Sequence, residues 1–222
     1  MNPNSLEAIY VSSSYLRWKR ILDCVVAVVM LVPGAPAILF LVILVRLTSK
    51  GPGVLRQRRV GMRGKVFVMF KIRTMIDGAE ATTGPTWAGT RDPRCIPFGQ
   101  IMRDFRLDEL PQLFNVLRGD MSIVGPRPER PELAEPIAQE VPRYFSRLTV
   151  PQGVTGLAQL NLPPDIGLDG VQRKLQLDLE YANTCSIWLD FRIMLYPILR
   201  LILVSNGKTL RVLGLARKSP AA

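Results

Sequence analysis

The stretch that decides the fold runs from Phe98 to Pro128 and reads FGQIMRDFRLDELPQLFNVLRGDMSIVGPRP. Its apolar residues recur at helical spacing on both sides of Pro111. Because proline is tolerated only in the first turn of a helix, we expect two helices, the second beginning near Asp108. Aspartate is a favoured N-cap residue, and an N-cap Asp108 would lie beside free N–H groups at the positive end of the helix dipole. Such a helix end suits a phosphate group.

Two acids, Asp108 and Glu109, stand side by side in this stretch, and the chain contains no histidine. Four arginines flank the pair: Arg103, Arg106, Arg118 and Arg127. A carboxylate can attack phosphorus to give an acyl phosphate, and such a site needs cations to offset the negative charge. The alternative is a helix cap followed by a solvated glutamate, and spacing alone favours that simpler interpretation.

The composition predicts one domain with an anionic partner. The chain has 222 residues, a net charge of +11 and 48% hydrophobic residues. The excess of positive charge suits nucleic acid, a phosphate-rich substrate or an anionic membrane surface. Aromatic residues are sparse among the basic runs, which disfavours a nucleic-acid platform. The three cysteines form no CxxC or zinc pattern, and this indicates free thiols in a reducing compartment.

An uncharged run from Cys24 to Val45 is long enough to span a bilayer at about 1.5 Å per residue. Pro33 and Pro36 fall near its centre and would break the helical ladder. The result is either a kinked spanning helix or a re-entrant hairpin that enters and leaves on one face. Basic residues flank both ends of the run, which favours the hairpin, with both ends at the cytoplasmic side.

Asp23 lies at the edge of this run, where a lone carboxylate is costly unless it is paired. We weigh two interpretations evenly. Asp23 is either an anchor that pairs with Arg20 or another basic group, or a residue that lies at the level of the lipid headgroups.

Two short strands follow the membrane segment, at 54–57 and 66–73, around a glycine-containing turn. Alternation along the second strand places Lys71 and Arg73 on one face, where together they could grip a phosphate. A solvated basic face is the alternative, and a basic run usually has that role. After the acidic pair, Pro126 and Pro128 stiffen the loop that carries Arg127, and a fixed guanidinium suits bidentate phosphate recognition.

Several of these segments carry a resemblance to a known family. The segment RLDELPQLFNVLRGDMSIVGPRPE resembles the signature of the bacterial sugar transferases, the monotopic phosphoglycosyl transferases. KIRTM at 71–75 is similar to the family's Lys-Phe-Arg-Ser/Thr-Met element, and Lys19, Arg20 and Asp23 match its entry pattern before the membrane helix. The resemblance extends from about Lys19 to about Val204, and its central motif is long and specific.

The resemblance implies roles for individual residues. It makes Asp108 the nucleophile and Glu109 its catalytic partner, with Mg²⁺ as the cofactor held by the same two carboxylates. It places Arg103 near the lipid phosphate. The anionic substrates are expected to bind Lys71, Arg73, Arg103, Arg118 and Arg127. The family's re-entrant helix is broken at a Ser-Pro pair, and here Ala35-Pro36 stands at that place, so Pro33 and Pro36 are the expected membrane break.

The C-terminal third resembles the family less closely. LTVPQGVTGLAQL at 148–160 is similar to its Pro-Gly-Val/Ile-Thr-Gly-Leu-x-Gln-Val element, with departures at Gln152 and Ala158 that leave the sugar unidentified. Residues 171–183 have a helical pattern. The apolar segment 186–204 is interrupted by charges and predicts either an amphipathic interfacial helix, with Trp188 and Tyr196 near the headgroups, or a core helix.

The expected architecture is an α+β, membrane-associated catalytic domain with an N-terminal re-entrant membrane hairpin and amphipathic interfacial helices. Its parts are a membrane segment at 1–50, a catalytic domain on the cytoplasmic face at 51–205 and a basic tail at 206–222. The resemblance implies an Mg²⁺-dependent enzyme of the bacterial inner membrane. It would move a sugar 1-phosphate from a UDP-sugar to polyprenol (undecaprenyl) phosphate and release UMP, as the first step of exopolysaccharide or glycoconjugate synthesis.

The expected partners are the UDP-sugar, the polyprenol phosphate and membrane lipids, with no nucleic acid, and homo-oligomerisation is left open. The alternative function is a non-catalytic, basic membrane-surface binding or scaffold protein. That alternative predicts no special role for Asp108 and a binding of any polyanion that falls steeply with salt.

Overall fold

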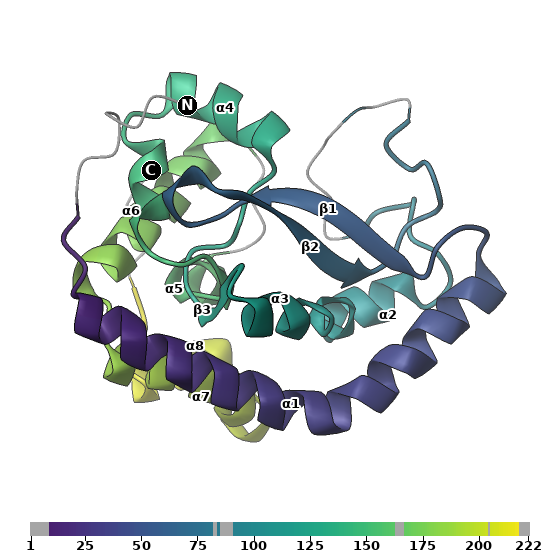
Figure 1. Ribbon diagram of the computed structural model, residues 1–222, viewed down its shortest axis with the longest axis horizontal. Coiled ribbons are helices and arrows are strands. Elements are labelled where there is room, and N and C mark those ends of the chain that lie inside the picture. Colours follow the sequence, from purple (N-terminus) through teal and green to yellow (C-terminus); the bar gives the residue numbers. More distant parts are fainter. Residues whose placement is uncertain (1–8, 82–83, 85–90, 163–166, 204, 218–222) are drawn as a thin grey trace.

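The computed structural model describes residues 9–81, 84, 91–162, 167–203 and 205–217. Helices and short strands alternate along the chain in a mixed α+β arrangement (Figure 1). The α-helices are α1 (Ser13–Thr48), α2 (Gly99–Asp104), α3 (Gln112–Arg118), α4 (Pro131–Glu140), α5 (Leu157–Asn161), α6 (Leu168–Thr184), α7 (Ile187–Leu203) and α8 (Asn206–Val212). The strands are β1 (Val54–Val60), β2 (Val66–Ile72), β3 (Ser122–Val124) and β4 (Gly153–Thr155). Three 3₁₀ turns, η2 (Met62–Gly64), η3 (Leu107–Glu109) and η4 (Tyr144–Thr149), complete the order.

The strands form two small sheets. β1 and β2 make the predicted antiparallel hairpin, in register from Val54↔Ile72 to Val60↔Val66. β3 and β4 pair in parallel through Ser122↔Gly153 and Val124↔Thr155. In the hairpin, Phe67 and Met69 point inward and are buried, whereas Val66 and Val68 lie on the other face and are exposed. The alternation of β2 therefore gives the hairpin one face toward the core and one toward solvent.

Helix α1 carries the whole apolar run as one continuous helix, with Pro33 and Pro36 inside it. It is long and apolar enough to cross a membrane by length and composition, and most of its apolar window is not buried by the protein. Figure 1 shows α1 bent near its middle, with both ends turned toward the side on which the hairpin lies. The break expected at Pro33 and Pro36 is thus a bend within one continuous helix, and proline explains a bend of this kind.

Polar side chains fasten the first part of α1 to the rest of the chain. Lys19 Nζ lies 2.8 Å from Asp190 Oδ2, and both side chains are buried. Asp23 Oδ1 accepts a hydrogen bond of 3.0 Å from the N–H of Ile123 in β3. Arg20 donates to the carbonyl oxygens of Val116 and Leu117 at the end of α3. Asp23 is therefore held inside the protein by a backbone N–H, and the charge of Lys19 acts on it, which supports the interpretation of Asp23 as an anchor.

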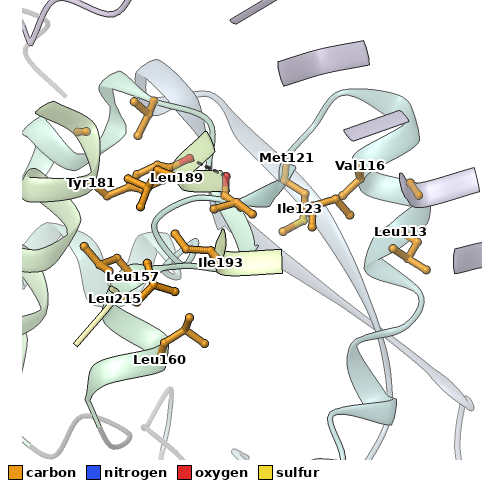
Figure 2. Packing of buried hydrophobic residues seen from close by; sticks show 14 of the residues in the cluster. Leu113, Val116, Met121, Ile123, Leu157, Leu160, Tyr181, Leu189, Ile193 and Leu215 are labelled. Atoms are coloured by element: carbon orange, nitrogen blue, oxygen red, sulfur yellow. Dashed lines mark hydrogen bonds between the residues drawn. The ribbon is translucent and has the colours of Figure 1, made fainter. Parts of the chain in front are cut away.

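The main core lies between α1, α3, the β3–β4 sheet and the C-terminal helices. Figure 2 shows Leu157, Leu160 and Leu215 packed near Ile193 and Tyr181, with Leu113 and Val116 of α3 farther along the same cluster. A second cluster joins α4, η4 and α6, and a third packs Leu41 and Val45 of α1 against Ile72, Ile96 and Met102. Packing thus fixes both halves of α1 against the remaining elements.

The C-terminal region differs in part from the expectation. The predicted helix at 171–183 is confirmed as α6. Helix α7 buries Leu189 and Ile193 in the core but exposes Trp188 and other apolar residues on its opposite face. It therefore has features of a core helix and of an amphipathic interfacial helix. The expected basic tail is folded as far as residue 217, because α8 and the residues after it bury Leu210, Leu213 and Leu215.

Candidate active site

The acidic pair lies in the turn between the two predicted helices. Helix α2 ends at Asp104 and α3 begins at Gln112, while Asp108 and Glu109 form the 3₁₀ turn η3 between them. The prediction of two helices is confirmed, but the prediction of Asp108 as an N-cap is wrong: Pro111 is the N-cap of α3. Arg106 adopts the left-handed conformation (φ 54°) just before η3, which turns the chain sharply toward the protein interior. Both acids are consequently only 8% exposed.

Asn115 of α3 holds this turn against the β hairpin. Its side chain is fully buried, accepts a 3.0 Å hydrogen bond from the N–H of Phe70 and donates one of 2.7 Å to the carbonyl oxygen of Val68. The amide therefore bonds two backbone groups on the free side of β2, as another strand would. This contact sets Lys71 of β2 beside η3. Sequence reasoning did not identify Asn115, since a buried asparagine in a helix has no local pattern that reveals its distant partner.

Glu109 is the centre of an ion-pair cluster. Its Oε1 lies 3.1 Å from Nζ of Lys71 and 2.5 Å from a terminal nitrogen of Arg127. Lys71 comes from β2 and Arg127 from the loop after β3, so three separate segments meet at one carboxylate oxygen. The other oxygen, Oε2, is buried and has no hydrogen-bond partner in the described part of the chain. A buried carboxylate oxygen without a partner is costly, and a cation bound there would satisfy it.

The two neighbouring acids have opposite pKa shifts. Burial raises the pKa of Asp108, and the charges of Lys71 and Arg127 reduce this rise without cancelling it. Burial also acts to raise the pKa of Glu109, but the nearby charges of Arg127 and Lys71 outweigh it and hold that pKa well below its usual range. Glu109 is therefore the more acidic member of the pair, and Asp108 is the more basic carboxylate.

A divalent cation fits the donor set of this turn. No group of three or more metal-binding side chains occurs among the described residues, so a cage made by the protein alone is absent there. Mg²⁺, however, is usually bound by one or two carboxylates together with substrate phosphates. Asp108 and the unpartnered Oε2 of Glu109 offer that kind of donor set.

Arg103 and Arg127 both act on the acidic pair. Arg103 lies in the last turn of α2 and lowers the pKa of Asp108 through its charge. It also donates to Sγ of Cys95 at 3.5 Å. Arg106, which was not predicted as a binding residue, lowers the pKa of Glu109 in the same way.

Two of the predicted binding residues lie elsewhere. Arg73 is 4% exposed and donates to the carbonyl oxygens of Ser49 and Lys50 after α1, so it does not reach out together with Lys71. Arg118 pairs with Asp120 at 3.3 Å and stacks over Phe70 on the outer face of the hairpin. Lys71 belongs to the opposite, inner face of the same strand. The structure thus brings Lys71, Arg103 and Arg127 to the acids, and it separates Arg73 and Arg118 from them.

The loop that carries Arg127 is held in place by Arg147 and by close packing against β4. Arg147 in η4 is fully buried, donates 2.8 Å to the carbonyl oxygen of Arg127 and pairs with Asp178 at 2.7 Å. Gly125 lies so close to β4 that a Cβ there would meet the carbonyl oxygen of Pro151 at 2.2 Å. The segment 148–160 therefore supports the Arg127 loop. Residues 163–166, which follow this segment, lie outside the described residues.

The fold and site together define a class of protein: an α+β domain that carries one long apolar helix and a buried Asp-Glu pair surrounded by basic residues. Comparison with known sequences identifies the family. The model of the family described as bacterial sugar transferase matches residues 14–203. The chain belongs to the bacterial sugar transferase family.

Three curated relatives illustrate the similarity. A UDP-N-acetylgalactosamine-undecaprenyl-phosphate N-acetylgalactosaminephosphotransferase of Aeromonas hydrophila is 35% identical over 207 residues, which are 93% of this chain and 48% of the relative. An undecaprenyl-phosphate glucose phosphotransferase of Komagataeibacter xylinus is 36% identical, over 85% of this chain and 36% of the relative. A UDP-glucose:undecaprenyl-phosphate glucose-1-phosphate transferase of Caulobacter vibrioides is 36% identical, over 85% of this chain and 71% of the relative. The chain thus spans about half or less of the length of the first two relatives.

Proposed function

We propose that this protein is a phosphoglycosyl transferase that moves a sugar 1-phosphate from a UDP-sugar to polyprenol (undecaprenyl) phosphate. The observation that carries the proposal is the Asp108–Glu109 turn, where a basic carboxylate and a more acidic one lie among Lys71, Arg103 and Arg127. The names of the relatives support the donor and acceptor classes. The reaction would provide the lipid-linked sugar with which exopolysaccharide or glycoconjugate synthesis begins.

The proposed chemistry has two displacements at one phosphorus. An oxygen of Asp108 attacks the phosphorus that bears the sugar, and the bond from that phosphorus to the bridging oxygen breaks. UMP leaves with the bonding electrons, and the sugar phosphate remains on Asp108 as an acyl phosphate. An oxygen of the polyprenol phosphate then attacks the same phosphorus, and the bond to Asp108 breaks. The raised pKa of Asp108 suits it to the attack, because a more basic carboxylate is a stronger nucleophile.

The charged residues of the site would offset the charge of the diphosphate. Lys71 and Arg127 already neutralise Glu109, and Arg103 lies where its charge acts on Asp108. Asp108 and Glu109 would hold Mg²⁺, which when bound supplies additional positive charge for the phosphates. The lowered pKa of Glu109 favours its ionised form, so Glu109 can hold a cation while Asp108 reacts.

Helix α1 would place this site at a membrane surface. We infer that α1 is re-entrant, with its bend at Pro33 and Pro36 and both ends on the cytoplasmic face of the inner membrane. The exposed apolar residues of α1 and the direction of both its ends in Figure 1 support this arrangement. A re-entrant helix requires that cysteines introduced by Ser14→Cys and Lys50→Cys react with an impermeant thiol reagent from the same side. Reaction from opposite sides would instead establish a spanning helix.

The decisive experiment measures UMP release. The full chain in nanodiscs is given Mg²⁺, polyprenol phosphate and a panel of UDP-sugars, in parallel with the Asp108→Asn variant. UMP release that depends on the lipid and one sugar, and that disappears in the variant, supports the function and the nucleophile. If no sugar gives release and no phospho-aspartate adduct forms on the folded protein, the proposal fails, and the scaffold alternative takes its place.

A further inference from the structure

The outer face of the β1–β2 hairpin carries a basic depression that the proposed reaction does not use. It is an open depression with a volume of about 490 Å³ and is lined by Arg56, Arg58, Val68, Phe70 and Arg118. We call these five residues the outer basic depression. Arg56↔Phe70 and Arg58↔Val68 are register pairs of the hairpin, so four of the five side chains stand on one strand face. Lys71, which contacts Glu109, belongs to the opposite face, and this separates the depression from the acidic pair.

The depression is suited to an anion with an apolar part. None of its five lining residues is acidic, and three are arginines. Arg56 and Arg58 are exposed and make no salt bridge among the described residues. Arg118 is held in place by Asp120 at 3.3 Å and by the ring of Phe70 at 5.9 Å, and its side chain is 62% exposed. Val68 is also exposed, so an apolar surface lies between the guanidinium groups.

Its position relative to α1 indicates which anion it meets. Arg118 ends α3, and the last carbonyl groups of that helix accept hydrogen bonds from Arg20 of α1. Arg20 comes just before the uncharged run that begins at Cys24, where the chain passes from headgroup level into the bilayer. Arg118 lies over Phe70, the register partner of Arg56 near the start of β1. β1 begins shortly after α1 ends, and Figure 1 shows the strands rising from that end of the helix. In the re-entrant arrangement proposed for α1, Arg118 and Arg56 would therefore both lie near points where α1 leaves the apolar layer.

We propose that the outer basic depression binds the headgroup of an anionic phospholipid and so fixes the tilt of the domain on the membrane. The phosphate would lie between the arginines, where guanidinium groups offer paired donors. Val68 and Phe70 would contact the glycerol and the first carbons of the chains. This inference rests on the proposed seating of α1 in the membrane, but it does not depend on the transferase reaction.

The test uses a photoreactive phosphatidylglycerol in nanodiscs of phosphatidylcholine that hold the full chain, and mass spectrometry locates the crosslinks. We expect crosslinks on peptides from the outer face of β1 and β2 and from the end of α3. The double variant Arg56→Gln, Arg58→Gln should lose more than about tenfold of this labelling, since each arginine near an anionic surface contributes roughly fivefold. A photoreactive phosphatidylcholine should label these peptides no more strongly than it labels peptides from the neighbouring surface.

The matched control removes the same charge from the same hairpin. Arg63 and Lys65 are exposed at its tip, at the far end of the strands from α1. The double variant Arg63→Gln, Lys65→Gln should change the labelling by less than about twofold, because a local site does not depend on the total charge. Both double variants are first shown to unfold thermally like the wild type.

Several outcomes would overturn the inference. If both double variants lost the same share of the crosslink labelling, the labelling would come from the general attraction of a basic protein to anionic lipid. Displacement of the label by soluble inorganic diphosphate would mean that the depression binds free anions. Because no sugar nucleotide or polyprenol phosphate is present, failure of the transferase proposal leaves this result unaffected. Conversely, UMP release by the wild type would not support the lipid site if the labelling experiment does not detect it.

Discussion

Two of the buried clusters of charged and polar side chains in the described part of the chain differ in completeness. At the seam between α1 and the C-terminal helices, Asp190 accepts hydrogen bonds from Lys19 (2.8 Å), Tyr15 (2.9 Å) and Tyr181 (2.6 Å). None of these four side chains has a buried atom without a partner. At the acidic pair, Oε2 of Glu109 has no partner in the described chain, and burial leaves Asp108 with a raised pKa.

The difference indicates what each cluster is for. A fully bonded cluster gains nothing from a ligand, so the seam is suited to holding α1 at a fixed position against the domain. A cluster with an unpartnered oxygen and a basic carboxylate gains stability when a cation and a phosphate arrive. We therefore expect mutations to separate the two clusters: those at the acidic pair should reduce activity, and those at the seam should reduce stability.

The largest effect should come from Asp108→Asn. Loss of the attacking oxygen should lower UMP release by about 10⁴-fold or more, as removal of a nucleophile commonly does. The melting temperature should stay the same or rise, because burial disfavours the ionised form of Asp108 and the amide carries no charge. Turnover and thermal unfolding measured on the same nanodisc sample check both parts. If Asp108→Asn were less stable than the wild type and still turned over appreciably, the acidic pair would not differ in role from the seam.

Asp190→Asn should have the next largest effect, on stability. It would leave the buried ammonium of Lys19 without its counter-charge, and breaking a buried ion pair costs about 3–5 kcal/mol of unfolding free energy. Asp169→Asn in the first turn of α6 is the control, because Asp169 is exposed and its replacement should change stability by about 0.5 kcal/mol or less. Denaturant unfolding in detergent measures both. UMP release per folded molecule should remain close to the wild-type value in Asp190→Asn.

The sequence predicted several helices and strands correctly, because these features are local. The hairpin strands, the helices on either side of Pro111 and α6 follow from periodicity in short windows. The seam could not be predicted in this way: Lys19 and Asp190 are far apart in the sequence, and nothing near either residue reveals the other. The same holds for Asn115, which bonds backbone groups of β2, and for Arg147, which bonds the carbonyl oxygen of Arg127 and pairs with Asp178.

Two errors had the same origin. Asp108 was expected at a helix N-cap because the residue type favours it, but Arg106 takes a left-handed conformation and the chain turns inward before the helix starts. The C-terminal residues were expected to form a tail because they are basic, but Leu210, Leu213 and Leu215 find space in the core between α5 and α7. In both cases tertiary packing outweighed the local preference.

Arg103→Gln should reduce turnover moderately. The charge of Arg103 acts on Asp108 from α2, and loss of one stabilising charge near a phosphoryl group typically costs about 10- to 100-fold. Arg103→Lys keeps the charge and should recover part of the rate. The comparison of kcat with KM for the polyprenol phosphate then shows whether Arg103 acts mainly on binding or on the reaction. An Arg103→Gln variant with unchanged kcat and KM would remove this residue from the site.

The smallest effect, and the most specific, concerns pH. Asp108 must be ionised to attack, and burial raises its pKa, so kcat/KM for the UDP-sugar should fall as the pH falls through a value above the 3.8 of an ordinary aspartate. Glu109 cannot produce this acid limb, because the charges of Arg127 and Lys71 hold its pKa well below the usual range. A pH–rate profile of UMP release in nanodiscs measures the limb.

Replacing Arg103 or Arg106 shows which of the two acids produces the acid limb of the pH–rate profile. Arg103 lowers the pKa of Asp108, and Arg106 lowers that of Glu109. If Asp108 titrates, Arg103→Gln should move the acid limb to higher pH, because the ionised carboxylate loses a favourable charge, and Arg106→Gln should move it less. A limb that moves only in Arg106→Gln would assign the titration to Glu109. The cluster with the unpartnered oxygen would then react through the other acid, and the roles proposed for Asp108 and Glu109 would have to be exchanged.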